Sequence, residues 1–280
     1  MTQIIRERLF LVGCPRSGTT LLQSLLAAHS QVASFPESHF LAVNGKSQWA
    51  YFCMLLGLVS SEMTTRVDEF LLEIERPDMK SRLPKSAFLL RPYTAAFVNI
   101  LDQLALHQGN IHWLEKTPGH LHYIKQLERY VKGAKFIHIL RNGADVVASM
   151  YEYTNKDPQA WGGKYSIDQC IERWNGDIQR SQKHVGKKNH AFVRYEELVT
   201  QPEAILSQLC DFIGLPFEAT MLTEYRTTAD HLILPHETWK NPVKQSIRST
   251  NGTKFKRVFN HAQQDYIWKH LKPIESSSQL

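Results

Sequence analysis

The sequence lacks the features that mark membrane-spanning and secreted proteins. Its longest apolar run, Trp49 to Val59, is well short of the roughly 20 residues that a membrane-spanning helix needs. We expect this run to form a buried helix or part of an apolar wall over a site. The N-terminus has no signal-peptide arrangement of a basic end, an apolar stretch and a small-residue cleavage site. These absences predict a chain without a membrane span.

Cysteine is scarce and widely spaced. The sequence has four cysteines, far apart and without a C-x-x-C pair: Cys14, Cys53, Cys170 and Cys210. This spacing argues against a zinc site built on cysteines and against a disulfide framework. A reducing cytoplasm is therefore the expected location.

Positive charge is in moderate excess, with a formal net charge of +6. A positive balance favours anionic ligands. The basic residues are dispersed, however, and the sequence has no basic-aromatic motif typical of nucleic-acid recognition. We therefore expect a polyanionic small molecule as ligand and no nucleic acid as partner.

Strand-like and helical patterns alternate along most of the chain. Strand-like apolar runs lie at residues 8–13, 31–35, 110–116, 134–140 and 190–198. Helical spacing lies at 19–29, 65–75, 94–107, 119–131, 142–153, 166–185 and 202–214. Asn142 is placed to cap one helix and Gly214 to end another. Strands separated by helices predict an α/β fold with a central, mainly parallel sheet, whose ligands sit beyond the carboxyl ends of the strands.

The pattern weakens beyond Asp230. Residues 239–259 are rich in basic and turn-forming residues and are expected to form an ordered, basic loop. No internal repeat is visible, and the only low-complexity stretch is the serine-rich tail.

The first strand leads into "GCPRSGTT", which has the glycine spacing of a phosphate-binding loop. Gly13 and Gly18 bracket four residues as in G-x-x-x-x-G-K-[ST], but Thr19 replaces the lysine and Arg16 precedes the second glycine by two residues. A turn between a strand and a helix directs backbone N–H groups and the helix dipole at an anion. Because a positive residue, two glycines and two hydroxyls coincide here, we favour a phosphate site over a plain tight turn.

The ends of the other strands carry basic side chains rather than the acidic residues of a metal-binding site. Kinases and NTPases use the loop lysine together with an acidic residue at a strand end for magnesium. Here the run 134–140 is followed by Arg141, and the only competing acid, Glu115, lies directly beside Lys116. This arrangement favours an anionic donor that is neutralised by side chains, with no metal required.

Several motifs, taken in their order and spacing, resemble the sulfotransferases that use 3′-phosphoadenosine 5′-phosphosulfate (PAPS). The motifs are PRSGTTLL, AHSQVASFPES, EKTP, FIHILRNGADVVASM and VRYEELVTQPEAIL. Within that family the sequence is most similar to the tyrosylprotein and related bacterial branch. The resemblance implies a three-layer, P-loop-like fold in which residues 1–280 form a single domain, with a helical acceptor-side insertion at about 48–108.

The resemblance also implies an activity. It implies transfer of a sulfonate from PAPS to a hydroxyl of a small molecule, a glycan, a lipid or a tyrosine-like phenol, with release of 3′-phosphoadenosine 5′-phosphate (PAP). The expected cofactor is PAPS, with no metal ion, and the expected partner is a hydroxyl-bearing acceptor.

Donor-binding residues follow from the same resemblance. The loop residues that would hold the 5′-phosphosulfate are Arg16, Ser17, Gly18, Thr19 and Thr20. Arg141 and Ser149 match the pair that holds the 3′-phosphate, the group that separates PAPS from ATP. Tyr195 matches a tyrosine that touches the adenine, although a buried strand tyrosine is an equal alternative. Lys254 matches a basic residue of the C-terminal cofactor loop, where the usual G-R-W-R-like run is degraded.

Catalysis of sulfonate transfer needs a base on the acceptor and a cation on the leaving phosphate. Glu37 aligns with the glutamate that serves as base in the tyrosylprotein branch, and Lys116 aligns with the lysine near the bridging oxygen. Arg16 can hold the donor in place through several hydrogen bonds from its planar guanidinium group. His120 is the second choice for the base and His39 the third, because proline occupies the position of the histidine that the cytosolic enzymes use.

Two other functions stay open at this point. A metal-dependent nucleotide kinase would need an acid placed for magnesium, and a non-catalytic nucleotide-binding protein would bind the nucleotide without sulfating an acceptor. The aromatic residues Trp49, Tyr51, Phe52 and Phe70 suit an apolar, phenolic or lipid-like acceptor, or simply the core. The oligomeric state is also open, a homodimer included.

Overall fold

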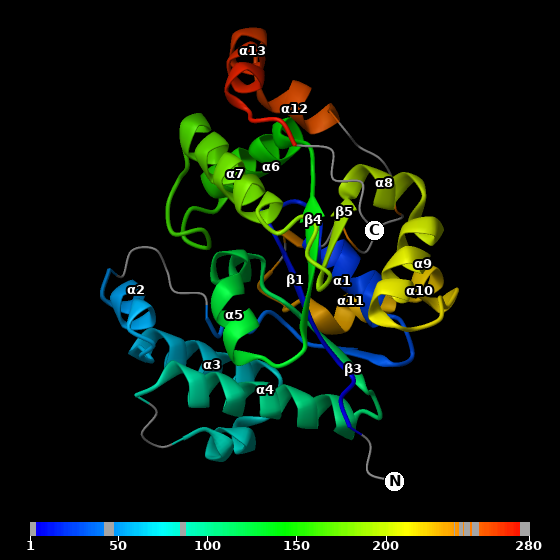
Figure 1. Ribbon diagram of the computed structural model, residues 1–280. Helices are drawn as coiled ribbons and strands as arrows, with labels where there is room; N and C mark the ends of the chain where they lie inside the picture. Colours follow the sequence, from blue (N-terminus) through cyan, green and yellow to red (C-terminus); the bar gives the residue numbers. More distant parts are fainter. Residues whose placement is uncertain are drawn as a thin grey trace.

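The computed structural model describes residues 4–41, 48–84, 88–237, 239–240, 243, 247 and 252–274. Its centre is a five-stranded sheet in the order β2-β3-β1-β4-β5 (Figure 1). The strands are β1 (Glu7–Gly13), β2 (Val32–Ser34), β3 (His112–Lys116), β4 (Ala134–Leu140) and β5 (His190–Arg194). All neighbouring pairs of these strands are parallel. The predicted α/β fold with a parallel sheet and flanking helices is confirmed.

The side chains of β1 alternate between two apolar faces of the sheet. Leu9 and Leu11 belong to the core on one face, and Phe10 and Val12 to the core on the other; none of them is exposed. A parallel strand that is covered on both faces reads as a continuous apolar run. This burial explains why "RLFLVG" shows no polar alternation.

One face of the sheet is covered by the first helix of the chain and by three helices that follow β5. These helices are α1 (Thr19–Ala27), α9 (Pro202–Ile213), α10 (Thr220–Thr223) and α11 (Tyr225–Leu232) (Figure 1). The short helix α8 (Tyr195–Thr200) connects β5 to α9.

The opposite face carries two groups of helices. Near β1 and β3 lie α3 (Ser61–Glu73), α4 (Leu90–His107) and α5 (Ile124–Tyr130), with the 3₁₀ helices η1 (Pro77–Arg82) and η2 (Pro118–Tyr123). Near β4 and β5 lie α6 (Gly143–Lys156), α7 (Ile167–Gln182), α12 (Thr253–Val258) and α13 (His261–His270). The sheet is therefore the middle of three layers.

The apolar run at Trp49–Val59 forms a helix, α2 (Gln48–Leu55), but this helix is not buried as expected. Ala50, Cys53 and Met54 pack inward, whereas Trp49 is 68% and Phe52 50% exposed. A helix this short has one side against the protein, so the apolar residues on its other side face solvent. Among the described residues, no helix has both the length and the apolar character needed to cross a bilayer.

Two expectations near the C-terminus are corrected. The strand predicted at 190–198 ends at Arg194, and "YEELVT" is the helix α8, which carries acidic residues in its first turn as a helix N-terminus favours. The basic segment 239–259 includes the helix α12, and much of the rest lies outside the described residues. The next helix, α13, was not predicted; it begins at a capping box of Asn260 and Gln263.

The predicted helix ends at Asn142 and Gly214 are confirmed. The side chain of Asn142 accepts hydrogen bonds from the backbone N–H groups of Ala144 at 2.9 Å and Asp145 at 3.4 Å. Gly214 ends α9 in the left-handed conformation, with φ of 88°.

Candidate active site

Residues predicted for the site come from the carboxyl end of every strand. Arg16 follows β1, Glu37 follows β2, Lys116 ends β3, Arg141 follows β4 and Tyr195 follows β5. Because the carboxyl ends of parallel strands lie at one edge of a sheet, the fold brings these distant residues to the same edge.

The two glycines of the loop after β1 are required by packing. A Cβ atom on Gly13 would lie 2.7 Å from the backbone oxygen of Ile139 in β4. Gly18 has φ of 98°, and a Cβ atom there would lie 2.4 Å from the ring of Tyr195. The loop therefore turns sharply into α1 and lies directly against the residue that begins α8. Between the glycines, Arg16 itself has a positive φ of 72°, a conformation that non-glycine residues adopt at a cost.

Arg16 connects this loop to α6. Its Nε donates a hydrogen bond to the Oγ of Ser149 at 3.2 Å, and its guanidinium carbon lies 4.2 Å from the ring centroid of Tyr153. The ammonium group of Lys254 lies 4.9 Å from the centroid of the same ring and pairs with Glu152 at 2.8 Å. Lys254, predicted for the C-terminal loop, thus belongs to α12 and sits beside the loop after β1.

Arg141 and Tyr195 form the other wall of this loop. The guanidinium carbon of Arg141 lies 4.0 Å from the ring centroid of Tyr195, and its Nη1 donates to the backbone oxygen of Arg16 at 3.3 Å. The ring of Tyr195 is therefore held between Arg141 and Gly18. As the first residue of α8, Tyr195 is not the strand tyrosine considered above, and it is only half-buried.

Polar atoms at this loop have no partner within the described part of the chain. The Oγ of Ser17 and the Nε of Arg141 are both buried without a hydrogen bond. Buried polar groups are almost always satisfied, and leaving one unsatisfied costs about 1–3 kcal/mol. Two such atoms at one glycine-bracketed loop, together with two arginines, indicate a place for an anionic ligand.

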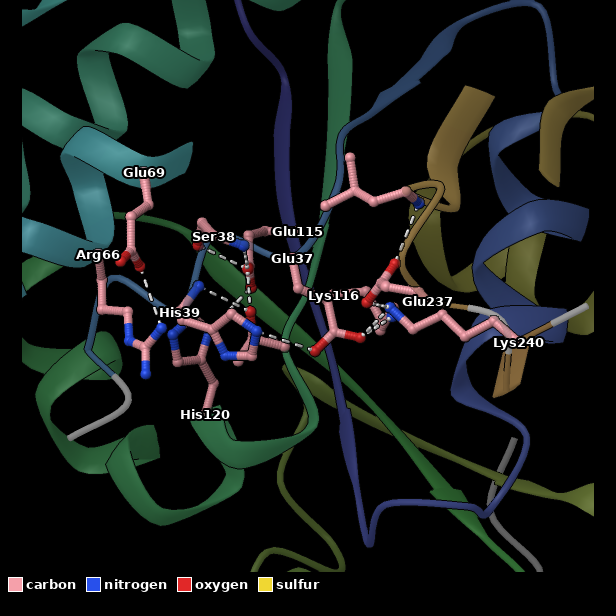
Figure 2. Close-up of polar contacts among 12 residues, drawn as sticks. Glu37, Ser38, His39, Arg66, Glu69, Glu115, Lys116, His120, Glu237 and Lys240 are labelled. Atoms are coloured by element: carbon pink, nitrogen blue, oxygen red, sulfur yellow. Dashed lines mark hydrogen bonds and ion pairs between the residues drawn. The ribbon is translucent and has the colours of Figure 1, made fainter. Parts of the chain in front are cut away.

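A second cluster surrounds Glu37, on the segment after β2 (Figure 2). Lys116 forms an ion pair with the Glu37 carboxylate, and the Nζ of Lys240 lies 2.7 Å from the same Oε1. Lys240 also pairs with Glu237, three residues earlier in the chain. All of these side chains are largely buried, so the charges interact without much screening by water.

This pairing changes the proton affinities of the cluster. Burial alone would raise the pKa of Glu37, but Lys116 and Lys240 outweigh it and hold that pKa well below its ordinary value. Burial, only partly offset by Glu37, lowers the pKa of Lys116 to about 8. Glu37 is therefore a carboxylate that carries no proton, and Lys116 loses its charge more easily than an ordinary lysine.

His120, the second choice for the base, has both ring nitrogens engaged. Its Nδ1 lies 2.8 Å from the Oε2 of Glu115, and its Nε2 accepts a hydrogen bond from the backbone N–H of Leu41 at 3.4 Å. Ser38 and Thr117 donate to the other oxygen of Glu115 at 2.7 Å and 2.6 Å. His120 is fully buried within this network, which ties the segment after β2 to the end of β3. This geometry disfavours His120 as the base.

His39, the third choice, lies closer to solvent. Its side chain is 43% exposed, and its Nε2 lies 3.5 Å from the Oε2 of Glu37. Burial outweighs the attraction of Glu37 and lowers the pKa of His39, so its imidazole is neutral at pH 7. Figure 2 shows Arg66 and Glu69 of α3 beside His39. The helical region thus borders the site on the side of His39.

Residues that the sequence analysis missed also line the site. Lys240 supplies a second cation to Glu37, Tyr153 is the ring between Arg16 and Lys254, and the backbone oxygen of Trp239 accepts from Arg16 at 3.4 Å. Trp239 and Lys240 connect the two clusters. Their only sequence signal was the basic character of the segment 239–259.

Comparisons with known proteins identify the family of the chain. Residues 8–219 match the sulfotransferase family, and the chain belongs to that family. A protein-tyrosine sulfotransferase from Caenorhabditis elegans is 25% identical over 228 residues, which are 76% of this chain and 51% of that protein. The chain thus spans about half the length of this relative.

Solved structures of sulfotransferases share the fold. The sulfotransferase domain of the curacin biosynthetic pathway superposes with a TM-score of 0.62 at 20% identity, covering 95% of this chain and 97% of that domain. A mouse sulfotransferase in complex with PAP superposes with a TM-score of 0.53 at 15% identity, covering 95% of this chain and 84% of the other.

Proposed function

We propose that this chain is a PAPS-dependent sulfotransferase that transfers a sulfonate to a hydroxyl of its acceptor. The observation that carries the proposal is the pair of buried, unsatisfied atoms, Ser17 Oγ and Arg141 Nε, at a loop rich in cations. The family supports it, as do the tyrosine sulfotransferase relative and the PAP held by the mouse structure.

The residues at the loop fit a donor with phosphates at both ends of its ribose. We assign the 5′-phosphosulfate to the loop after β1, that is, to Arg16, Ser17, Gly18, Thr19 and Thr20. Arg141 and Ser149 would hold the 3′-phosphate, Tyr195 would contact the adenine, and Lys254 would add positive charge from α12. When bound, PAPS supplies an activated sulfonate.

Glu37 is our candidate for the group that takes the proton of the acceptor hydroxyl. A general base works best when its pKa lies near the working pH, and Lys116 and Lys240 hold the pKa of Glu37 well below that. An anion that draws these lysines away from Glu37 would raise the pKa of its carboxylate. We therefore infer that donor binding and the basicity of Glu37 are coupled through Lys116 and Lys240, and that Lys116 then stabilises negative charge on the leaving side.

The pairing of the carboxylates favours this proposal over a magnesium-dependent kinase. Glu37 is paired with two lysines, and Glu115 accepts from Ser38, Thr117 and His120. A magnesium ion at the strand ends would have to break one of these arrangements. Neutralisation of the donor by side-chain cations requires none of these interactions of Glu115 to break.

The test is a thermal-shift series with PAP and ATP, each with magnesium or with a chelator. We expect PAP to stabilise the protein without magnesium and ATP to do so much less. A ligand at 100 times its Kd adds about 2.7 kcal/mol to the free energy of unfolding.

Arg141→Ala tests the contact with the 3′-phosphate. The substitution should weaken the binding of PAP by about 1.5–3 kcal/mol, the range for a hydrogen bond to a charged group. It should leave the binding of the 3′-dephospho analogue nearly unchanged.

Two other outcomes of these experiments would favour the alternative functions. Equal shifts by PAP and ATP, or a requirement for magnesium, would favour the kinase. Strong binding of PAP with no sulfation of any of a panel of phenols, alcohols and tyrosine peptides would favour a non-catalytic nucleotide-binding protein.

A further inference from the structure

A cluster of histidines lies away from the candidate active site. Glu128 is on α5, His184 follows α7, and His190 begins β5. Each offers one ligand atom, and the three atoms lie within 4.8 Å of one another. In the part of the chain that the structure describes, this is the one group of three such residues. It sits at the amino end of β5, whereas the candidate active site lies at the carboxyl ends of the strands.

His190 is the centre of this cluster. Its Nε2 lies 3.1 Å from the Oε1 of Glu128, and its Nδ1 lies 2.9 Å from the Nε2 of His138 in β4. The ring of His184 stacks on that of His190, with 4.7 Å between centroids and 16° between planes. The register explains the contact with β4: His190 pairs with Phe136, so His138 lies two residues further along the same face of the sheet.

The hydrogen bonds of these rings leave nitrogen atoms unused. Because a carboxylate only accepts, the Nε2 of His190 carries the proton toward Glu128, and its Nδ1 accepts from His138. The Nδ1 atoms of His138 and His184 are then buried without a partner among the described residues.

We propose that Glu128, His184 and His190 form a binding site for a transition-metal ion of the zinc class. Two imidazoles and a carboxylate are a ligand set that zinc accepts, with water completing the shell. In the bound form both rings change tautomer: the Nε2 lone pair of His190 faces the ion, its Nδ1–H donates to the Nε2 of His138, and His138 carries its own proton on Nδ1. That outer hydrogen bond is the one that metal-binding histidines usually make.

The side chains can close on an ion with small movements. With zinc–ligand bonds of about 2.1 Å, tetrahedral ligand atoms lie about 3.4 Å apart. Glu128 and His190 already meet this spacing at 3.1 Å, and no separation among the three ligand atoms exceeds 4.8 Å. His184 is on the short connection between α7 and β5, and the Glu128 side chain is 27% exposed. Both can rotate, whereas His190 is fixed by β5 and His138.

Lys187 is the competitor for this site. Its Nζ lies 3.0 Å and 3.1 Å from the two carboxylate oxygens of Glu128. An incoming ion must displace this ammonium group and is repelled by its charge. The assignment therefore makes opposite predictions for neighbouring residues: loss of Glu128 or His184 weakens metal binding, and loss of Lys187 strengthens it.

The experiment is a calorimetric titration of the untagged full chain with Zn²⁺, repeated with Co²⁺ and followed by visible absorption. We expect one saturable ion per chain. Glu128→Gln and His184→Ala should each weaken it more than about 100-fold, beyond the 10–100-fold typical for loss of an outer partner. Lys187→Met should tighten it about tenfold, the effect of removing one nearby charge at a partly solvated site. His107→Ala, which removes an exposed histidine elsewhere, is the matched control and should change nothing.

Circular dichroism of the metal-free variants separates loss of a ligand from loss of the fold. The assignment is overturned if the wild-type chain binds no ion, or if folded Glu128→Gln and His184→Ala bind as tightly as wild type. An unchanged affinity in Lys187→Met would mean that the ion does not use the Glu128 carboxylate, and would overturn it as well.

Discussion

Glu37 lies between Lys116 and Lys240, and this position gives its carboxylate two competing tasks. The ion pairs keep two buried lysines charged and satisfied, but they also remove the basicity that proton transfer requires. If Glu37 is the base, as proposed above, we expect it to act only when another anion shares the lysines. The pairing of Glu37 with Lys116 and Lys240 therefore determines when the proposed proton transfer can begin.

Replacing Glu37 with glutamine keeps the size of the side chain and removes the base. We expect the affinity for PAP to survive while kcat on an alkyl alcohol falls about 10²–10⁴-fold, the usual contribution of general-base catalysis. An acidic phenol, already ionised at the assay pH, should recover activity with Glu37→Gln but much less with Lys116→Ala, because the second variant lacks the cation on the leaving side.

Steady-state kinetics with phenols of graded pKa separate these two variants. An unchanged kcat for Glu37→Gln on the alkyl alcohol, with chemistry shown to be rate-limiting, rules out Glu37 as the base. His39 would then be the next residue to replace, since its side chain is partly exposed and lies beside Glu37.

The lowered pKa of Lys116 predicts a loss of activity in alkaline solution. Its pKa in the folded protein is about 8, against an ordinary 10.5, so the charged form is present below pH 8 and disappears as the pH rises through that value. Because kcat/KM reports the free enzyme, kcat/KM for the donor should fall above about pH 8.

Lys116→Arg is the control, since a guanidinium keeps its charge throughout this range. It should shift the alkaline fall to higher pH even where its maximal rate is lower. A profile that is the same for wild type and Lys116→Arg would assign the alkaline fall to another group.

At the scale of elements, the loop between β1 and α1 is shaped by its contacts as much as by its glycines. Gly13 lies against β4, Gly18 against Tyr195, and Arg16 spans to α6. The loop is therefore the point at which three separate elements meet, and the orientation of its N–H groups depends on all of them.

Gly18→Ala tests this packing. Both the positive φ and the approach to 2.4 Å of Tyr195 oppose a Cβ atom, and we expect a loss of unfolding free energy larger than the 1–3 kcal/mol typical of a strained backbone alone. Gly109→Ala is the matched control, because Gly109 has φ of 81° with nothing within 4 Å of its Cβ position. Urea denaturation of both variants gives the comparison; equal losses would show that the contact with Tyr195 has no cost.

Some helices and strands were predicted correctly from the sequence pattern, and others were not. The strands β1 and β4 were predicted well because buried parallel strands are short, continuous runs of apolar residues. The helix α2 was predicted, but the expectation that it is buried was wrong. An apolar run does not reveal whether other parts of the protein cover both sides of the helix. The helix α12 was missed because a short, basic helix depends on its contacts rather than on its own periodicity.

At the scale of the whole molecule, the order β2-β3-β1-β4-β5 determines which residues meet. β1 lies between β3 and β4, so the loop after β1 sits between Lys116 and Arg141. The helical region, α2 to α4, extends from the side of Glu37 and His39. That the acceptor binds on that side stays a prediction from the sequence.

The sequence by itself determined the fold class and the family, and it predicts that the first loop binds a phosphate. These depend on local patterns: runs of apolar residues, glycine spacing and short motifs. The tertiary structure alone decided that Lys240 joins Lys116 at Glu37, that His120 is enclosed by Glu115 and Leu41, and that Glu128, His184 and His190 converge. The physical reason is that charge pairing and burial act between residues that are close in space but far apart in the chain, and only the folded sheet brings those residues together.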